Sequence, residues 1–176
     1  MQNWKILKKI IEPKFKGLGK SHCMMPTIKK IKKDTIRVYY SSRDTENISR
    51  IFYSDYNLEK EKLLKSSSEP VLDIGELGAF DDNGVTPSWI INHNKQKFLL
   101  YVGWNTGGNT RMSLFAGLAK LKKKIFERVL ESPVLERNEH DAFLTATSCV
   151  LKENGVFRMW YVSGDGWSSK NNETLP

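Results

Sequence analysis

Three segments of the chain share one pattern of apolar and polar positions. Each has a short apolar run, a polar stretch, and a second apolar run that ends in aromatic residues. Short runs rich in β-branched and aromatic residues, separated by turn-forming residues, are typical of β-hairpins. The pattern therefore predicts hairpins with polar tips at KKIKKD, NHNKQK and KENG. The segments are PTIKKIKKDTIRVYYSS from Pro26, PSWIINHNKQKFLLYVGW from Pro87 and TSCVLKENGVFRMWYVSG from Thr147.

Two further elements of the pattern recur after the first and second hairpins. SRIFYSDYN (49–57) and RMSLFAGLA (111–119) each follow a polar loop and predict a third strand with small residues where a neighbour comes close. SSSEPVLD (66–73) and LESPVLER (130–137) then match at their prolines and predict an outer fourth strand. Proline fits in or just before an outermost strand, because that strand has a free edge.

The repeat has a period near 60 residues, and no helical pattern interrupts it. Four-stranded units that repeat along a chain are typical of a β-propeller, in which such units form blades around a central axis. We therefore predict an all-β fold, and the alternative is a short β-sandwich that happens to repeat. The predicted single, partial propeller domain covers 1–176, with a closing strand at 1–13, blade one at 21–73, blade two at 82–137 and part of blade three at 142–176.

The length of the chain limits how many blades it holds. Its 176 residues hold two whole blades and the first hairpin of a third. A closed propeller needs at least about four blades. The final segment, SSKNNETLP, has the composition of a polar loop at a point where a third strand should follow. We therefore expect the chain to be the N-terminal part of a longer protein, or a truncated gene product.

The chain is basic, because it has 28 Lys and Arg and only 20 Asp and Glu, which gives a net charge of +8. Such a balance favours anionic partners such as nucleic acid, phosphorylated sugars or a membrane surface. The lysine clusters at 29–34 and 120–124 lack the interleaved aromatic or arginine residues of a nucleic-acid platform. We interpret them as solvated hairpin tips and edges and predict no nucleic-acid partner, with an anionic partner as the alternative.

The two cysteines, Cys23 and Cys149, lack the spacing of a zinc site. We expect them to be buried thiols in a reducing compartment, and we predict neither a metal nor another cofactor. No run of the sequence has the length of a membrane span or the features of a signal peptide. The chain is therefore predicted to be cytoplasmic.

Polar side chains that suit binding or catalysis gather at the predicted strand ends. In a propeller, the segments before each first strand and after each second strand lie together around the channel. Trp faces stack on flat rings, and carboxylates and Arg bind hydroxyl groups, so this combination is typical of a carbohydrate site. Two carboxylates across the channel can also catalyse glycosyl transfer. The candidates are His22, Arg43, Asp81, Asp82, Trp104, Glu139, Asp141, Asp165 and Trp167.

Several of these residues also have a purely structural interpretation. Asp-Asp-Asn-Gly at 81–84 is a turn-forming sequence whose Asp side chains can cap the turn. The RNEHD stretch (137–141) can be a solvated loop, His22 can be a core residue, and Arg43 can pair with Asp44.

Five segments carry a resemblance to a known family: HCMMPT, YYSSRD, FDDNGVTPSW, SPVLERNEHD and MWYVSGDGW. In these segments the chain resembles the five-bladed β-propeller glycosidase superfamily, which includes arabinanases, β-xylosidases, invertases and levansucrases, with mannoside phosphorylases as a related group. It is similar above all to glycosidase-like proteins of polysaccharide-biosynthesis gene clusters. The resemblance implies a carbohydrate or sugar-phosphate ligand and cleavage of a glycosidic bond by hydrolysis or phosphorolysis.

The resemblance also implies roles for particular residues. The acidic position of blade two falls on Asp82 or Asp81, and the carboxylate of blade three matches Glu139, with Asp141 as its rival. Arg43 matches the arginine that follows the first hairpin of the family. Glu139 would then be the general acid, Asp82 would orient or tune the site, and Arg43 would bind sugar hydroxyls or phosphate together with His22.

The chain departs from the family pattern in blade one. Arabinanase-type enzymes carry an Asp just before the first strand, as a general base, whereas this chain has Lys20-Ser21-His22-Cys23. That departure favours a second hypothesis, a non-catalytic sugar-binding or scaffold propeller in glycan assembly. The clustered carboxylates favour the first hypothesis, a glycosidase-like enzyme.

Overall fold

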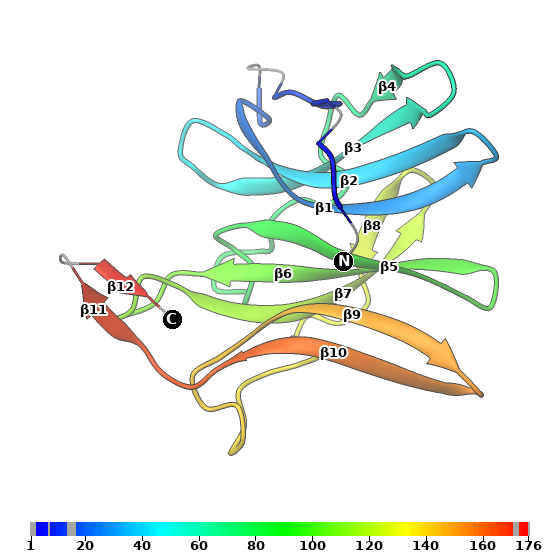
Figure 1. Cartoon of the computed structure of the whole chain (residues 1–176). Coiled ribbons are helices and arrows are strands. Elements are labelled where there is room, and N and C mark those ends of the chain that lie inside the picture. The colour runs from blue at the N-terminus through cyan, green and yellow to red at the C-terminus, as the bar shows by residue number, and fades with distance from the viewer. Residues whose placement is uncertain (1–2, 7, 14–16, 171–172, 176) are drawn as a thin grey trace.

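The computed structural model describes residues 3–6, 8–13, 17–170 and 173–175, and this part of the chain contains strands and turns without a helix. Figure 1 shows its main sheets stacked one on the next, with the first sheet at the top of the view. The two complete sheets are four-stranded and antiparallel, and each is formed by strands consecutive in sequence. The prediction of an all-β fold built from such sheets is confirmed.

The strands follow the recurring pattern of the sequence. The predicted third strand of the first unit coincides with β3, and all three predicted hairpins form. The first sheet contains β1 (Ser21–Lys32), β2 (Thr35–Arg43), β3 (Ser49–Asn57) and β4 (Lys62–Ser66). The second contains β5 (Val85–His93), β6 (Gln96–Asn105), β7 (Ser113–Lys122) and β8 (Ile125–Arg128). The third contains β9 (Leu144–Glu153) and β10 (Val156–Gly164).

Two hairpin turns explain how the tips form. Asn94 and Lys95 join β5 to β6 with positive φ angles of 47° and 60°, and Asn154 and Gly155 join β9 to β10 with φ angles of 50° and 82°. Two consecutive residues of positive φ form a type I′ turn, whose twist matches that of the flanking strands. Asn and Gly adopt this backbone conformation more readily than other residues.

The outer edge of each complete sheet differs from the prediction. The fourth strands lie earlier than expected, so that Pro70 and Pro133 follow β4 and β8 rather than starting them. Beyond each proline, one residue returns to the sheet: Leu72 forms an isolated antiparallel bridge with Ile51, and Leu135 forms one with Ala116. The edge is interrupted at proline because this residue has no N–H to contribute to a ladder.

The two ends of the chain also differ from simple expectation. The segment predicted to be a polar loop contains two short antiparallel strands, β11 (Ser168–Lys170) and β12 (Glu173–Leu175). Their pairing satisfies backbone polar groups that a loop would leave to water. Residues 3–6 and 8–13 contain no strand, and the closing strand at 1–13 stays a prediction, as does the division into blades.

The hydrophobic core lies between the first and second sheets. Tyr39 and Ile51 of the first sheet meet Leu99 and Tyr101 of the second, and all four are essentially inaccessible to solvent. The ring of Phe126, from β8, meets that of Tyr39 edge-on with centroids 5.6 Å apart. Each sheet therefore buries its apolar face against the next sheet, which is the packing that a stack of amphipathic sheets requires.

The first strands of the sheets lie next to one another: β1 contacts β5, and β5 contacts β9. Ser88 joins β5 to β9, because its Oγ donates to the Ser148 carbonyl at 2.5 Å and accepts from the Ser148 amide at 2.7 Å. Ser49 forms a parallel bridge with Gly84, where a Cβ would lie 2.7 Å from the Ser49 Oγ. This close approach brings the loop before β3 next to the turn before β5.

Gly117 offers a test of the packing in the second sheet. It lies opposite Tyr101, and a Cβ at this position would lie 2.3 Å from the Tyr101 Cζ. Because Tyr101 is fully buried and cannot move aside, we expect Gly117→Ala to lower the free energy of unfolding by about 1–3 kcal/mol. Urea denaturation measures this change. The matched variant Gly108→Ala, which meets no atom within 4 Å, should stay within about 0.5 kcal/mol of the parent protein, and equal losses in both variants would contradict the packing.

Candidate functional site

Asp81 anchors the turn that precedes β5. Its side chain is fully buried, and its Oδ2 accepts hydrogen bonds from the Tyr101 hydroxyl and the Arg128 Nε, both at 2.9 Å. Arg128 also donates to the carbonyl oxygen of Asp73 at 2.7 Å. The turn is thereby tied to β6 and β8 of its own sheet and to the segment that leads into it. Asp81 Oδ1 has no hydrogen-bond partner among the described residues.

The charge of Asp81 affects the groups around it. Burial raises the pKa of Tyr101 well above its usual range, and the neighbouring Asp81 carboxylate raises it further. For Arg128, burial acts to lower the pKa, but the hydrogen bond and charge of Asp81 outweigh this effect and raise it. Tyr101 therefore stays a neutral donor and Arg128 a cation. A buried carboxylate with such partners holds structure, while a substrate-binding role for Asp81 stays a prediction.

Asp82 is half-buried and differs from its neighbour. Its Oδ2 accepts from the Gly78 amide at 2.8 Å, and its Oδ1 accepts from the Asn105 Nδ2 at 2.9 Å. The same Asn105 nitrogen donates to the Ala79 carbonyl at 3.0 Å, so the end of β6 holds the turn and orients the carboxylate. Asp82 is thus held in one orientation at the turn by hydrogen bonds to both of its oxygens.

Trp104 directly precedes Asn105 in β6 and contacts the same turn through its backbone. Its backbone pairs with the turn, donating to the Gly84 carbonyl at 2.8 Å and accepting from the Asn83 amide at 3.0 Å. Its indole Nε1 donates to the Thr86 Oγ1 at 3.1 Å. The structure therefore brings Asp81, Asp82 and Trp104 together in one hydrogen-bonded unit.

Arg43 is the last residue of β2 and pairs with Ser49 of β3, which in turn bridges Gly84 of this unit. Its Nη1 donates to the Asn47 Oδ1 at 2.8 Å, and its buried Nε has no partner among the described residues. The interpretation that Arg43 pairs with Asp44 is wrong, because Asp44 pairs with Arg50 at 2.5 Å.

Asp44 organises the loop that carries Arg43. Its Oδ1 accepts from the Glu46 and Ile48 amides, both at 2.9 Å. Burial acts to raise the pKa of Asp44, but the Ile48 amide and Arg50 outweigh it, and the pKa lies below its usual range. The loop is thus held by a carboxylate that stays ionised, which leaves the Arg43 guanidinium available for another anion.

His22 lies in an irregular part of β1. The β1–β2 register shifts between Ser21 and Met24, and His22 has a φ of 65°. Such a bulge redirects a side chain, and His22 is exposed with its Nδ1 2.9 Å from the Ser21 Oγ. The interpretation of His22 as a core residue is wrong.

In the loop before β9, the acidic residues Glu139 and Asp141 have different environments. The Glu139 side chain is 85% exposed, and its Oε1 lies 3.4 Å from the His140 Nε2. Asp141 is buried and accepts from the Tyr161 hydroxyl at 2.7 Å and the Asn138 Nδ2 at 3.0 Å. Hydrogen bonds from Ser163, Tyr161 and Asn138 lower the pKa of Asp141. Among the described residues, no hydrogen bond or ion pair joins Glu139 to Asp82.

The remaining candidates follow β10. Asp165 is exposed and Trp167 is half-buried. They lie between β10 and β11, at the end of the third sheet where its second strand stops. Their part in binding stays a prediction.

Sequence analysis missed one repeated contact. Asp81 binds Tyr101, and Asp141 binds Tyr161, and both members of the second couple lie 60 residues after those of the first. The signal was present in the period of the repeat, because an Asp before a first strand and a Tyr in a second strand recur at the same spacing. By this equivalence Asp141 corresponds to the buried Asp81, whereas Glu139 has no acidic counterpart in the second unit.

One further aromatic residue, Trp89, was also missed. Trp89, at a bulge in β5, lies between two cavities beside the first strands of the sheets. One cavity, of about 430 Å³, extends to Thr27 of β1, and the other, of about 370 Å³, extends to Cys149 and Trp160. An indole face at such a cavity can stack on a sugar ring. The only sequence signal was the position of Trp89 directly after Pro87-Ser88.

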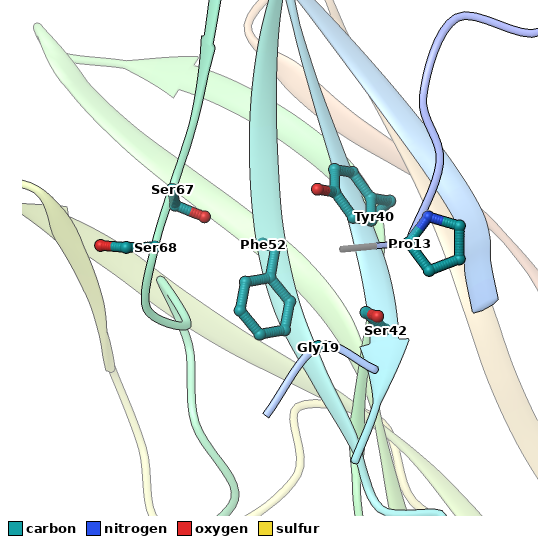
Figure 2. A pocket seen from close by; sticks show the side chains of 7 residues that line it. All are labelled: Pro13, Gly19, Tyr40, Ser42, Phe52, Ser67 and Ser68. Atoms are coloured by element: carbon teal, nitrogen blue, oxygen red, sulfur yellow. The ribbon is translucent and has the colours of Figure 1, made fainter. Parts of the chain in front are cut away.

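A third hollow lies on the first sheet and is much smaller. Figure 2 shows Pro13 and Gly19 of the N-terminal segment close to Tyr40, Ser42 and Phe52 of β2 and β3. Its volume of about 20 Å³ has room for a water molecule rather than a sugar. We interpret it as a packing irregularity.

Three further findings concern the cysteines, metal ligands and membrane spans. Cys23 and Cys149 are unpaired and half-buried, so they are less buried than expected. Across residues 3–6, 8–13, 17–170 and 173–175, no three His, Cys, Asp or Glu side chains gather in a way that suits a metal ion. The same residues contain no helix with the length and apolarity that crossing a bilayer requires.

Comparisons with known proteins give two sequence relatives and a set of structural neighbours. No protein-family model matches the chain. The uncharacterized proteins MT1551 and Rv1502 of two strains of Mycobacterium tuberculosis are each 32% identical over 173 residues, which is 97% of this chain and 58% of each relative. The chain therefore spans little more than half the length of these relatives.

The structural neighbours are glycoside hydrolases of propeller fold. A thermostable family-43 glycoside hydrolase matches with a TM-score of 0.59 and 16% identity, over 84% of this chain and 47% of that enzyme. A family 117 glycoside hydrolase, Zg3597 of Zobellia galactanivorans, matches with the same TM-score and identity over 94% of this chain and 48% of that protein. At such identity the likeness shows the fold alone. The predicted propeller fold is supported, while the number of blades stays a prediction.

Arg128 offers a test of the network that holds the turn. Removing it leaves the Asp81 charge buried with only the Tyr101 hydroxyl as a partner, and we expect Arg128→Ala to lower the free energy of unfolding by about 3–5 kcal/mol. Urea denaturation at pH 7 measures the change. Arg158→Ala is the matched control, because Arg158 forms a solvent-exposed pair 3.8 Å from Glu153 and should cost less than about 1 kcal/mol. Similar small losses in both variants would contradict the anchoring role.

Proposed function

We propose that this chain belongs to a carbohydrate-active, glycosidase-like propeller protein that cleaves a glycosidic bond by hydrolysis or phosphorolysis, in the metabolism of a surface polysaccharide. The observation that carries the proposal is the oriented Asp82 carboxylate, held by Gly78 and Asn105. It lies at the sheet end that the Ser49–Gly84 bridge joins to the Arg43 loop. The shared fold with glycoside hydrolases supports the same proposal.

The proposed site combines an acceptor, a cation and aromatic faces. Asp82, which accepts two hydrogen bonds, acts as an ionised group that orients the sugar or stabilises developing positive charge. Arg43 and His22 bind sugar hydroxyls or phosphate, and Trp104 supplies a ring face. Asp81, Asp141, Asp165 and Trp167 complete the proposed set, with Asp81 and Asp141 acting mainly through the turns that they hold.

Glu139 is proposed as the general acid. Its exposed carboxyl group donates a proton to the leaving oxygen while the glycosidic C–O bond breaks. In phosphorolysis, inorganic phosphate attacks the anomeric carbon and forms the new C–O bond, so no carboxylate is needed to activate water. This chemistry suits the segment before β1, where Lys20, Ser21, His22 and Cys23 include no carboxylate.

A second candidate function is sugar binding without catalysis, in a scaffold for glycan assembly. Two observations favour it. The segment at 20–23 lacks the acidic residue of the catalytic pattern. Glu139 is solvated and, among the described residues, shares no hydrogen bond or ion pair with Asp82.

One experiment separates the two functions. The full-length protein and its Asp82→Asn and Glu139→Gln variants are assayed for glycan binding on an array and for product release from a panel of 4-nitrophenyl glycosides, with and without inorganic phosphate. We expect each variant to lose at least about 100-fold in turnover and to keep glycan binding within about threefold. Glu136→Gln, which alters an exposed carboxylate near the same loop, should match the parent protein.

The outcomes are distinct. Wild-type turnover in both variants would contradict the catalytic roles. Glycan binding without any product release by the parent protein would establish the second candidate instead. Absence of both activities from the parent protein would contradict the carbohydrate proposal altogether.

A further inference from the structure

The positive charge of this chain is concentrated at one end of the two complete sheets. The β1–β2, β3–β4 and β5–β6 hairpins turn at this end, on the right in Figure 1. The β7–β8 turn lies at the same end of the second sheet, because the end of β7 pairs with the start of β6, where Lys120 lies opposite Phe98. We call these four hairpin tips the tip face, and they comprise residues 29–34, 58–62, 94–97 and 120–125.

The tip face carries more positive charge than the chain as a whole. It contains twelve lysines and three acidic residues, and therefore a net charge of +9, whereas the whole chain has a net charge of +8. The rest of the chain is thus close to neutral. Among the described residues, Lys122 is the only lysine of the tip face in an ion pair, with Glu127, and the acidic Glu61 pairs with Lys8. The unpaired lysines are available to an anionic surface.

Lys97 shows that this charge is crowded where the two sheets meet. The pKa of its half-buried ammonium group lies below its usual range, first because of burial and then because of the positive charges of Arg37 and Lys29. Asp55 acts in the opposite direction, but it already accepts two hydrogen bonds from Arg37, at 2.7 and 2.9 Å. An anion next to Lys97 would relieve this repulsion.

Exposed aliphatic side chains lie among the lysines. Ile31, Leu58 and Ile125 each come from a different hairpin tip, and they are 37%, 49% and 51% exposed. Ile31 lies at a bulge, because the register of β1 and β2 shifts between Lys30 and Lys32, and a bulge redirects a side chain. Removing such side chains from water is favourable. The tip face therefore offers apolar contacts as well as positive charge.

The composition of the tip face favours a lipid surface over other anionic partners. All of its cations are lysines, and it contains no arginine and no aromatic residue. Surfaces that bind single-stranded nucleic acid combine cations with aromatic side chains, and protein–protein interfaces are enriched in aromatic residues and Arg but poor in Lys. Surfaces that bind a bilayer instead combine lysines, which attract anionic headgroups, with apolar side chains that enter the boundary between headgroups and acyl chains.

We propose that the tip face docks on an anionic phospholipid bilayer. Its lysines contact the headgroups, and Ile31, Leu58 and Ile125 enter the boundary between headgroups and acyl chains. Both sheets that form this face are complete in the described part of the chain, so the lysines and the three aliphatic side chains do not lie beside an open sheet edge.

Docking in this way would orient the candidate site. β2 runs from Thr35 at the tip face to Arg43 at the opposite end, and β6 runs from Gln96 to Asn105. With a rise of about 3.3 Å per residue, strands of this length hold the two ends roughly 30 Å apart. The Asp82 turn would therefore face the water, away from the lipid. The docking itself does not rest on the proposed carbohydrate function.

Cosedimentation with vesicles tests the docking. The full-length protein is mixed with vesicles of phosphatidylcholine alone or of equal parts phosphatidylcholine and phosphatidylserine. We expect at least about tenfold tighter binding to the anionic vesicles at an ionic strength of about 0.1 M, and most of this difference should disappear at about 1 M. Anionic vesicles should also slow amide hydrogen exchange in the tip face and leave it unchanged in residues 78–84.

The role of the lysines is tested by reversing charge at each end of the molecule. The double variant Lys123→Glu, Lys124→Glu should bind anionic vesicles at least about tenfold more weakly than the parent protein. Arg137→Glu is the control, because Arg137 is an exposed cation near Phe115 at the opposite end. At that distance from the lipid its charge is screened, and binding should change by less than about twofold.

The role of the aliphatic side chains is tested in the same way. The triple variant Ile31→Ser, Leu58→Ser, Ile125→Ser should bind anionic vesicles at least about tenfold more weakly than the parent protein. Leu77→Ser is its control, because Leu77 is 99% exposed in the segment before β5, and it should bind as the parent protein does.

Four results would each overturn the proposal. They are equal binding to neutral and anionic vesicles, losses in the control variants as large as those in the tip-face variants, protection of residues 78–84 in place of the tip face, and binding to a DNA duplex without binding to vesicles.

Discussion

The contact between first strands is the constraint on which the rest of this structure depends. β1, β5 and β9 lie next to one another, and Ser88 links β5 to β9 by hydrogen bonds in both directions with Ser148. Gly84 brings the turn before β5 against Ser49, where a side chain larger than hydrogen would not fit. Because the sheets are stacked through these strands, loops that are distant in sequence reach one end of the molecule. A carbohydrate site assembled from several sheets requires this arrangement.

The two adjacent carboxylates at that end have different environments. Asp81 is buried, bound by Tyr101 and Arg128, and holds the turn, while Asp82 is half-buried and is oriented by Gly78 and Asn105. A buried ion pair contributes little net stability, but it is costly to break and therefore fixes one conformation. The turn-forming interpretation thus describes Asp81 directly, while a functional role for Asp82 stays a prediction.

The sequence predicted the strands better than it predicted the contacts among side chains. The recurrence of an apolar segment after a polar loop placed β3 at its observed bounds, and the Asn-Gly dipeptide placed a hairpin tip. The prolines gave a wrong position for the fourth strands, because they interrupt the outer edge of each sheet rather than begin its last strand. Arg128 was missed because its partner lies 47 residues away and a lone arginine in a strand carries no local signal. The Asp–Tyr contact could have been predicted from the spacing of the repeat. Its structural role could not, because that role depends on the burial of the side chains.

Amide hydrogen exchange at Ser148 tests the side-by-side arrangement of the first strands most directly, by comparing the parent protein with Ser88→Ala. The Ser148 amide donates to the Ser88 side chain, so the account predicts slow exchange in the parent protein. In the variant, exchange at this amide should be at least about tenfold faster, while the amides between β5 and β6 stay protected. Rapid exchange at Ser148 in the parent protein, or equal protection in both proteins, would contradict the contact and the stacking of sheets that rests on it.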